Sequence, residues 1–324
     1  IMYTAAGEVV AAASGLAWEE FLRKRLFEPL GMNDSVALLA ETRDRPNVAS
    51  PHDRVDGAIE VIKNASVDPV APAGSVWSSV EDMAKWMVFL LEGQPALLKD
   101  ETRADLFKPQ FIVGDSFYPT KQLTRPHWMT YASGWFQHDY NGRAVDFHTG
   151  SIDGMVAIIG LIRDERLGVY VLGNLDHAEV RHALMYRVFD LYGGGSARDW
   201  SRELKELYGN LHSEAVSRMK EVEHERVPGT EPTFPLEDYA GTYSDPLYGT
   251  IEVVYNGKLF IRYGPGLEGE LEHWHYDTFR ARWDAKWRGT LLVAFNMDTK
   301  GRPSTLMARG GVFTREEATD VRSR

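Results

Sequence analysis

Residues 133–174 decide the fold and read SGWFQHDYNGRAVDFHTGSIDGMVAIIGLIRDERLGVYVLGN. Four strand-like segments follow one another in this stretch, and they are Ser133–Asp139, Arg143–Phe147, Val156–Arg163 and Gly168–Asn174. Asn141 and Gly142 supply the two positive-φ residues of a tight type I′ turn, which predicts a hairpin between the first two strands. The second pair turns at residues 164–167. The pattern therefore predicts a continuous antiparallel sheet.

A His-Thr-Gly triplet followed by a serine lies between these two hairpins. Gly150 would let a ligand backbone approach closely, Thr149 offers a hydroxyl, and His148 offers a titratable donor. The triplet alone is a weak signal, because it arises by chance in many proteins. Its place on a strand between two hairpins makes His148, Thr149, Gly150 and Ser151 the candidate site residues.

Amphipathic helices are predicted on both sides of this stretch. Apolar residues at 18, 21, 22 and 26 follow a 3.6-residue period and predict a helix over Trp18–Leu26. The pattern of Ser78–Glu81 is typical of a capping box, and the apolar stripe after it predicts a helix over Ser79–Leu91. His177–Tyr192 is predicted as a helix that three glycines end and that packs across the sheet.

The chain changes character after residue 198. Asp199–Arg226 is charged and helical in pattern, and the run from Pro228 to Pro232 reads as a linker. Eight short strands follow, namely Tyr239–Tyr243, Gly249–Tyr255, Lys258–Tyr263, Glu270–Tyr276, Thr278–Trp283, Thr290–Asn296, Ser304–Ala308 and Val312–Arg315. Their even spacing predicts a small closed barrel. The fold class is therefore α+β, with an antiparallel sheet flanked by helices and a small all-β barrel after it.

Composition excludes several classes of function. The 324 residues carry a formal net charge of −11, which argues against nucleic acid as a partner, because phosphate binding needs clustered Lys and Arg. No apolar run approaches the ~20 residues that span a bilayer. The chain has no cysteine, which excludes disulfides, thiolate catalysis and cysteine metal sites.

Two histidines are close enough in sequence to be candidate metal ligands. His273 and His275 alternate on a predicted strand and would face the same side. The sequence places no carboxylate beside them, so we assign no metal site and expect no cofactor.

Six segments occur in the order found in the serine β-lactamase and penicillin-binding-protein family, and the chain resembles its class C and esterase-like branch. They are Tyr3–Val10, Trp18–Met32, Pro72–Met83, Gly134–Phe136, His148–Gly150 and Val171–Asn174. The resemblance covers roughly residues 1–192. It also implies a helix over Tyr3–Ser14, in a layer apart from the sheet.

One departure from the family concerns the nucleophile. The family keeps it in a Ser-x-x-Lys motif that precedes a Tyr-x-Asn motif, and Ile1 aligns just after the latter, so the N-terminal part of the domain is expected to be missing. Ser217 and Lys220 fit the spacing, but they fall in the charged connector and read as a solvated helix face. Tyr3 is expected to pack against the first turn of its helix. The outer edge of Gly168–Asn174 should be open or capped by other residues.

The resemblance implies acyl transfer at a serine, on amide, peptide or ester bonds, including those of D-amino acids and β-lactams, with a small molecule or a peptide as the expected partner. His148 stands where the family has lysine and would orient a substrate carboxylate or bond the catalytic tyrosine. Thr149 would bind the same carboxylate, Gly150 would line the site, and the backbone N–H of Ser151 would be an oxyanion-hole donor. The alternatives are a non-catalytic binding or oligomerisation module and a histidine-based metallohydrolase.

The expected organisation has four parts. Residues 1–198 form the C-terminal portion of a β-lactamase/transpeptidase-like domain, 199–232 a helical connector and linker, 233–318 a barrel, and 319–324 a tail. The barrel resembles the lipocalin-like domain attached to some relatives and is expected to fold by itself from Phe234 to Arg315. It could hold subunits together in a homo-oligomer. A periplasmic or secreted location follows from the family alone.

Overall fold

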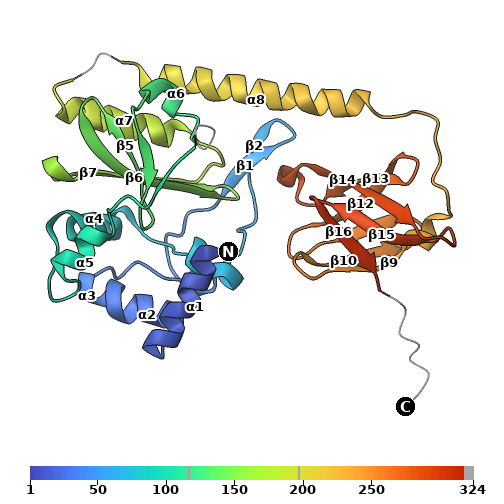
Figure 1. Ribbon diagram of the computed structural model, residues 1–324, viewed down its shortest axis with the longest axis horizontal. Coiled ribbons are helices and arrows are strands. Elements are labelled where there is room, and N and C mark those ends of the chain that lie inside the picture. Colours follow the sequence, from blue (N-terminus) through green and yellow to red (C-terminus); the bar gives the residue numbers. More distant parts are fainter. Residues whose placement is uncertain (115–117, 196–197, 317–324) are drawn as a thin grey trace. The chain divides into compact units, whose positions relative to one another are not determined.

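A computed structural model describes residues 1–114, 118–195 and 198–316. The chain divides into two compact units (Figure 1), one of Ile1–Asp53 with Ile59–Ser213 and the other of Arg54–Ala58 with Glu214–Arg324. Each is described by itself. The tail predicted at residues 319–324 lies outside the described residues. Within these ranges no helix is both long and apolar enough to cross a membrane.

The first unit is built on an antiparallel sheet with strand order β3-β4-β5-β6-β7-β8 (Figure 1). Its strands are β3 (Phe111–Ile112), β4 (Met129–Tyr131), β5 (Phe136–Tyr140), β6 (Arg143–Ile152), β7 (Met155–Ile162) and β8 (Leu167–Gly173). The continuous four-stranded sheet predicted from residues 133–174 is confirmed as β5 to β8. Strand β8 is an edge of the described sheet, as expected. Strands β3 and β4 were not predicted.

Two boundaries of the four predicted strands differ from the prediction by more than one residue. Strand β5 begins at Phe136 rather than Ser133, because Gly134, with φ of 88°, turns the chain between β4 and β5. Strand β6 continues past Phe147 to Ile152, so the His-Thr-Gly triplet belongs to the strand itself. The turn between β5 and β6 is as predicted, with φ of 50° at Asn141 and 77° at Gly142.

Helices cover the sheet, some before it and some after it in the chain (Figure 1). The α-helices are α1 (Met2–Ser14), α2 (Trp18–Leu22), α3 (Glu28–Leu30), α4 (Val80–Glu92), α5 (Asp100–Asp105), α6 (Lys121–Thr124), α7 (Val180–Tyr192) and α8 (Trp200–His224). A π-helical turn over Arg23–Phe27 joins α2 to α3. A small hairpin pairs β1 (His52–Val55) with β2 (Ala58–Val61). The 3₁₀ turns of the described chain lie at Leu39–Thr42, Asp68–Ala73, Arg163–Glu165, Leu236–Tyr239 and Lys286–Arg288.

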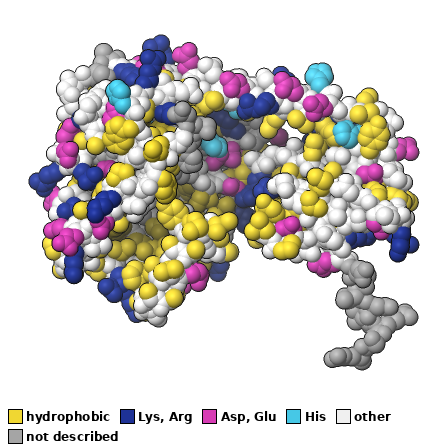
Figure 2. All heavy atoms as spheres, in the orientation of Figure 1, with side chains coloured by type: hydrophobic (Ala, Val, Ile, Leu, Met, Phe, Trp, Pro, Cys, Tyr) yellow, Lys and Arg dark blue, Asp and Glu magenta, His cyan; other side chains and the backbone are white. Residues whose placement is uncertain are grey.

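The predicted capping box at Ser78–Glu81 is wrong by one residue. Ser79 is the cap of α4, and its hydroxyl accepts a hydrogen bond of 3.2 Å from the Asp82 amide, which is the third residue of the helix. Helix α1 is largely at the surface, and Met2 and Val9 are exposed on it. In the space-filling view hydrophobic side chains gather over α1 and around the hollow beside it (Figure 2).

The sheet is packed between two layers. Phe89 and Leu90 of α4 join a core with Ile159 and Leu161 of β7 on one face. Helix α7 packs across the other face, as predicted, and its fully buried Met185, Tyr186 and Phe189 join a core with Phe147 and Ile158. Because successive strand residues alternate between faces, the two cores draw on alternating positions of β7.

The second unit contains a closed eight-stranded barrel, as predicted. Its strands are β9 (Gly241–Asp245), β10 (Gly249–Tyr255), β11 (Leu259–Arg262), β12 (Glu268–His275), β13 (Thr278–Trp283), β14 (Thr290–Met297), β15 (Pro303–Ala308) and β16 (Gly311–Arg315). Closure pairs β16 with β9. Rings of Tyr239, Phe279 and Phe295 meet inside at centroid distances of 5.0 to 5.6 Å. The likeness to lipocalins stays a prediction.

We expect residues 225–318 to fold without the rest of the chain. Every barrel strand is paired on both sides, and the interior is filled by aromatic and branched side chains of its own. The buried Tyr243 hydroxyl donates 2.9 Å to the carbonyl of Tyr239, so it is satisfied within the barrel. A thermal melt of the expressed fragment should show one cooperative transition. A broad, non-cooperative melt would show that the barrel depends on the remainder of the chain.

Candidate functional site

One edge of β6 is free along the His-Thr-Gly triplet. Pairing between β5 and β6 ends at Phe136 and Phe147. Within the described chain, residues 148–152 pair only with β7, on the opposite edge. Since alternate residues of a strand direct their N–H and C=O groups to the same edge, this segment offers backbone donors and acceptors to a ligand.

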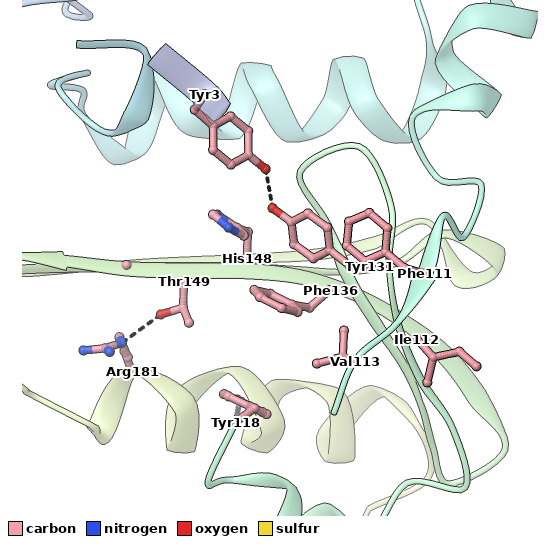
Figure 3. Close-up of a pocket in the computed structure, with 11 residues that line it drawn as sticks. Tyr3, Phe111, Ile112, Val113, Tyr118, Tyr131, Phe136, His148, Thr149 and Arg181 are labelled. Atoms are coloured by element: carbon pink, nitrogen blue, oxygen red, sulfur yellow. Dashed lines mark hydrogen bonds between the residues drawn. The ribbon is translucent and has the colours of Figure 1, made fainter. Parts of the chain in front are cut away.

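A cavity of about 670 Å³ adjoins this free edge (Figure 3). It is lined by Tyr3, Phe111, Ile112, Val113, Tyr118, Tyr131, Phe136, His148, Thr149, Gly150 and Arg181. The close-up shows His148 and Thr149 on opposite sides of β6, so the cavity wraps around the strand edge (Figure 3). The structure thus brings together three of the four predicted site residues, and Ser151 is exposed beside them.

His148 is an uncharged member of the site. Its ring stacks on Phe136 with a centroid distance of 5.6 Å and an interplanar angle of 11°. Burial lowers the pKa of the imidazole below its ordinary value, because desolvation disfavours the charged form. His148 is therefore neutral at pH 7 and can donate one hydrogen bond and accept another, but it does not provide the positive charge of a lysine.

The positive charge near the strand comes from Arg181 instead. Its Nε donates a 3.0 Å hydrogen bond to the Thr149 hydroxyl, which itself donates 2.8 Å to the carbonyl of Ala157. The Thr149 hydroxyl thus donates its hydrogen bond within the sheet and is not free to donate to a ligand. The guanidinium of Arg181 is the group that can attract an anion. Arg181 is buried, and its Nη1 has no hydrogen-bond partner among the described residues. An unpaired buried guanidinium nitrogen is costly, which makes it a candidate for ligand binding.

Glu179 compensates part of this charge. One of its oxygens lies 3.5 Å from Arg181 Nη2 and 3.1 Å from His182 Nε2. Burial alone would raise the pKa of Glu179, but contacts with His177 and His182 outweigh burial and lower it to about 2. His182 in turn lies 2.7 Å from the hydroxyl of Tyr118, which lines the cavity. The floor of the site is therefore a connected polar network.

Sequence reasoning missed Arg181, although a signal was present. Residues 181, 185 and 189 recur every four positions and share the buried stripe of α7 with Tyr186. An arginine on an otherwise apolar stripe is rarely buried without a partner or a ligand. Phe111 and Ile112 were also missed, and no sequence pattern marks them.

Gly150 leaves open space at the free edge. A Cβ built on it would have no atom within 4 Å. The space leaves room for a ligand backbone, and the binding role of Gly150 stays a prediction. The oxyanion-hole role of the Ser151 N–H stays a prediction.

Tyr3 reaches into the cavity rather than packing on its own helix. Its hydroxyl bonds the hydroxyl of Tyr131 (Figure 3). Burial and this bond raise the pKa of Tyr131 well above its ordinary value, so that hydroxyl stays protonated.

Two other sequence candidates lie outside the cavity lining. Ser217 and Lys220 are exposed on α8, which fits the interpretation of a solvated helix face. His273 and His275 flank a register shift in β12, and each contacts a backbone group, the carbonyl of Tyr276 and the amide of Val227. In the part of the chain that the structure describes, no group of three His, Asp or Glu could hold a metal ion.

Two family models match the chain. The model described as Beta-lactamase matches residues 1–192, more than half of the sequence. A second model, described as a domain of unknown function (DUF3471), matches residues 225–320, which contain the barrel.

The chain is also similar to two curated proteins. Unguisins hydrolases of Aspergillus campestris and Aspergillus violaceofuscus are 23% and 25% identical over 81% and 80% of this chain. The chain spans about half the length of either relative, 50% in both cases.

Among solved structures, an octameric penicillin-binding protein homologue from Pyrococcus abyssi has a similar fold. The match has a TM-score of 0.52 at 19% identity and covers 95% of this chain and 62% of that one. At this identity the likeness concerns the fold alone.

We expect His148 to titrate below pH 6.5, the ordinary value for histidine. His127 serves as an internal control, because its hydrogen bond to Asp139, 2.6 Å from Nδ1 to Oδ2, raises its pKa. A pH titration followed by NMR of the ring resonances should give midpoints on opposite sides of 6.5 for these two residues. A His148 midpoint above that of His127 would contradict the burial seen here.

Proposed function

We propose that this chain, which belongs to the beta-lactamase family, forms the substrate-binding wall of a serine hydrolase. The enzyme would cleave amide, peptide or ester bonds through an acyl-enzyme. The observation that carries this proposal is the free edge of β6 over residues 148–152, with Gly150 open beside a cavity. An extended substrate can pair with such an edge and so hold its carbonyl in a fixed position. The two curated relatives are hydrolases, which supports hydrolysis as the reaction.

The proposed reaction has two steps. A serine oxygen attacks the substrate carbonyl carbon and gives its proton to a lysine or tyrosine, and the amine or alcohol leaves with a proton. Water then attacks the ester, releases the acid and restores the serine. The backbone N–H of Ser151 would be one of two donors to the oxyanion.

The nucleophile in this proposal comes from a Ser-x-x-Lys segment outside residues 1–324. None of the eleven described residues that line the cavity is a serine or a lysine. The chain contributes instead the residues that hold the substrate.

Two residues of the cavity would share the recognition of polar groups. Neutral His148 would form one hydrogen bond with the substrate or with the catalytic tyrosine, without attracting anions from a distance. Arg181, whose Nη1 has no partner within the described ranges, would attract a substrate carboxylate. The sequence led to the expectation that the Thr149 hydroxyl binds this carboxylate. We assign the carboxylate to Arg181 instead, because the Thr149 hydroxyl already donates its hydrogen bond to the carbonyl of Ala157.

We expect the chain by itself to form no covalent adduct with a fluorophosphonate or another serine-directed acylating probe. Ser151 and Ser217 are exposed, and neither belongs to the cavity with a base beside it. Intact-mass spectrometry after incubation should show the unmodified mass. Stoichiometric labelling of either serine would refute the assignment of the nucleophile.

In a longer protein that contains this chain and the nucleophile segment, we expect His148→Ala and Gly150→Val each to lower kcat/KM by roughly 10²-fold. The first removes a hydrogen-bonding group of the site, and the second places a branched side chain where the substrate backbone would lie. Steady-state kinetics on a chromogenic amide or ester would measure the effect.

The matched control is His127→Ala, which removes an exposed imidazole outside the cavity lining. This substitution should leave kcat/KM within about twofold of the value for the unsubstituted protein. Full activity of Gly150→Val with an unchanged melting temperature would exclude substrate pairing along β6.

If the longer protein also forms no covalent adduct with the probe, the alternative of a non-catalytic binding module would be favoured. Oligomerisation through the barrel and a periplasmic or secreted location stay predictions.

A further inference from the structure

A row of four rings runs from the edge of the sheet to His148. Phe111 of β3 stacks on Tyr131 of β4 at 5.7 Å and 19°, and Tyr131 meets Phe136 of β5 edge-on at 4.6 Å. Phe136 stacks in turn on His148 of β6. All four line the cavity, as the close-up shows (Figure 3), and we call Phe111, Tyr131, Phe136 and His148 the ring row.

The outer end of the ring row is open. Phe111 is 62% exposed and Ile112, beside it on the same short edge strand, is 86% exposed. Exposed large apolar residues on an edge strand favour aggregation unless a ligand or partner covers them. Phe136, at the inner end, is buried and its partner His148 is half-buried, so the row leads from solvent to the free edge of β6.

The charge of the cavity lining restricts what can occupy the row. Arg181 is the one charged residue among the eleven described lining residues, and it lies on the Thr149 side of β6, opposite His148. No carboxylate lines the cavity within this set. A cationic side chain would therefore find no ion partner there, and a flat or bulky apolar group would gain both burial and ring contacts.

We propose that the ring row is the subsite for an aromatic or bulky aliphatic side chain of the substrate, next to the bond that is cleaved. This inference rests on the proposed function and narrows its substrate class to amides, peptides or esters that carry such a side chain. The neutral state of His148 suits this role, because a stacked imidazole without charge can stay in an apolar contact that a lysine would leave for water.

Direct binding to the chain tests the proposal without requiring hydrolysis. The probes are the N-acetyl amides of phenylalanine, alanine and lysine, each as both enantiomers, and the signal is the shift of the His148 ring resonances in NMR titrations. We expect at least one phenylalanine enantiomer to bind at least about tenfold more tightly than alanine, a difference of about 1.4 kcal/mol, because the ring is removed from water into an apolar contact. The lysine probe should bind no better than alanine.

Phe111→Ser should reduce the preference for phenylalanine over alanine to within about twofold, since it removes the exposed end of the ring row. Its exposure makes the substitution compatible with folding, which a thermal melt verifies. The matched control is Val61→Ser, an exposed strand residue outside the cavity lining, which should keep the full preference.

Equal affinity for the phenylalanine and alanine probes would overturn the proposal, and so would a preference that survives Phe111→Ser. Absence of any shift at millimolar phenylalanine probe would overturn it as well. These outcomes are separate from the fate of the acyl-enzyme proposal, which is decided by covalent labelling and by turnover in the longer protein. A preference for phenylalanine without turnover would retain the subsite and reject the hydrolase.

Discussion

The register between β5 and β6 is the constraint on which the site depends. The two-residue turn at Asn141 and Gly142 pairs Tyr140 with Arg143, and from there each pair is fixed up to Phe136 and Phe147. Gly134 then turns the chain away, which leaves the rest of β6 without a neighbour on that edge. A slip of one residue would move His148 to the other face of the sheet and place Thr149 next to the ring row.

A buried polar network reinforces this register. Asp146 is buried, and its two oxygens accept hydrogen bonds of 2.5 Å from Gln137 Nε2 and 2.6 Å from Arg163 Nε. Gln137 is the register partner of Asp146 on β5, and Arg163 follows β7. Removing either partner would leave the buried carboxylate of Asp146 short of a hydrogen bond, which is unfavourable because water cannot replace the lost donor there. The same atoms would be left unpaired in a slipped sheet, so the network penalises the wrong register two residues from His148.

Local patterns in the sequence predicted the parts of the fold that depend on local chemistry. The Asn-Gly turn, the amphipathic stripe of α7 and the even spacing of the barrel strands each have a short-range cause, and all three are present. Strands β3 and β4 were not predicted, because strands of two and three residues are too short to show a periodic pattern in the sequence. The triplet on β6 could be marked as a candidate from its setting. Arg181 was marked only by its place on the apolar stripe of α7, and nothing marked Phe111, because long-range pairing and packing bring both residues to that strand.

Closure of the barrel has a kinetic consequence. Strand β9 is the first strand of the barrel in sequence and β16 is the last, and yet they pair with each other. Loop-closure entropy makes such a distant pairing slow to form, and folding rates fall as contacts become less local. During synthesis the barrel cannot close until Arg315 has left the ribosome, whereas β5 to β8 are joined by short turns and can pair much earlier. Strands β5 to β8 can therefore pair while the barrel strands that follow them still lack their last partner.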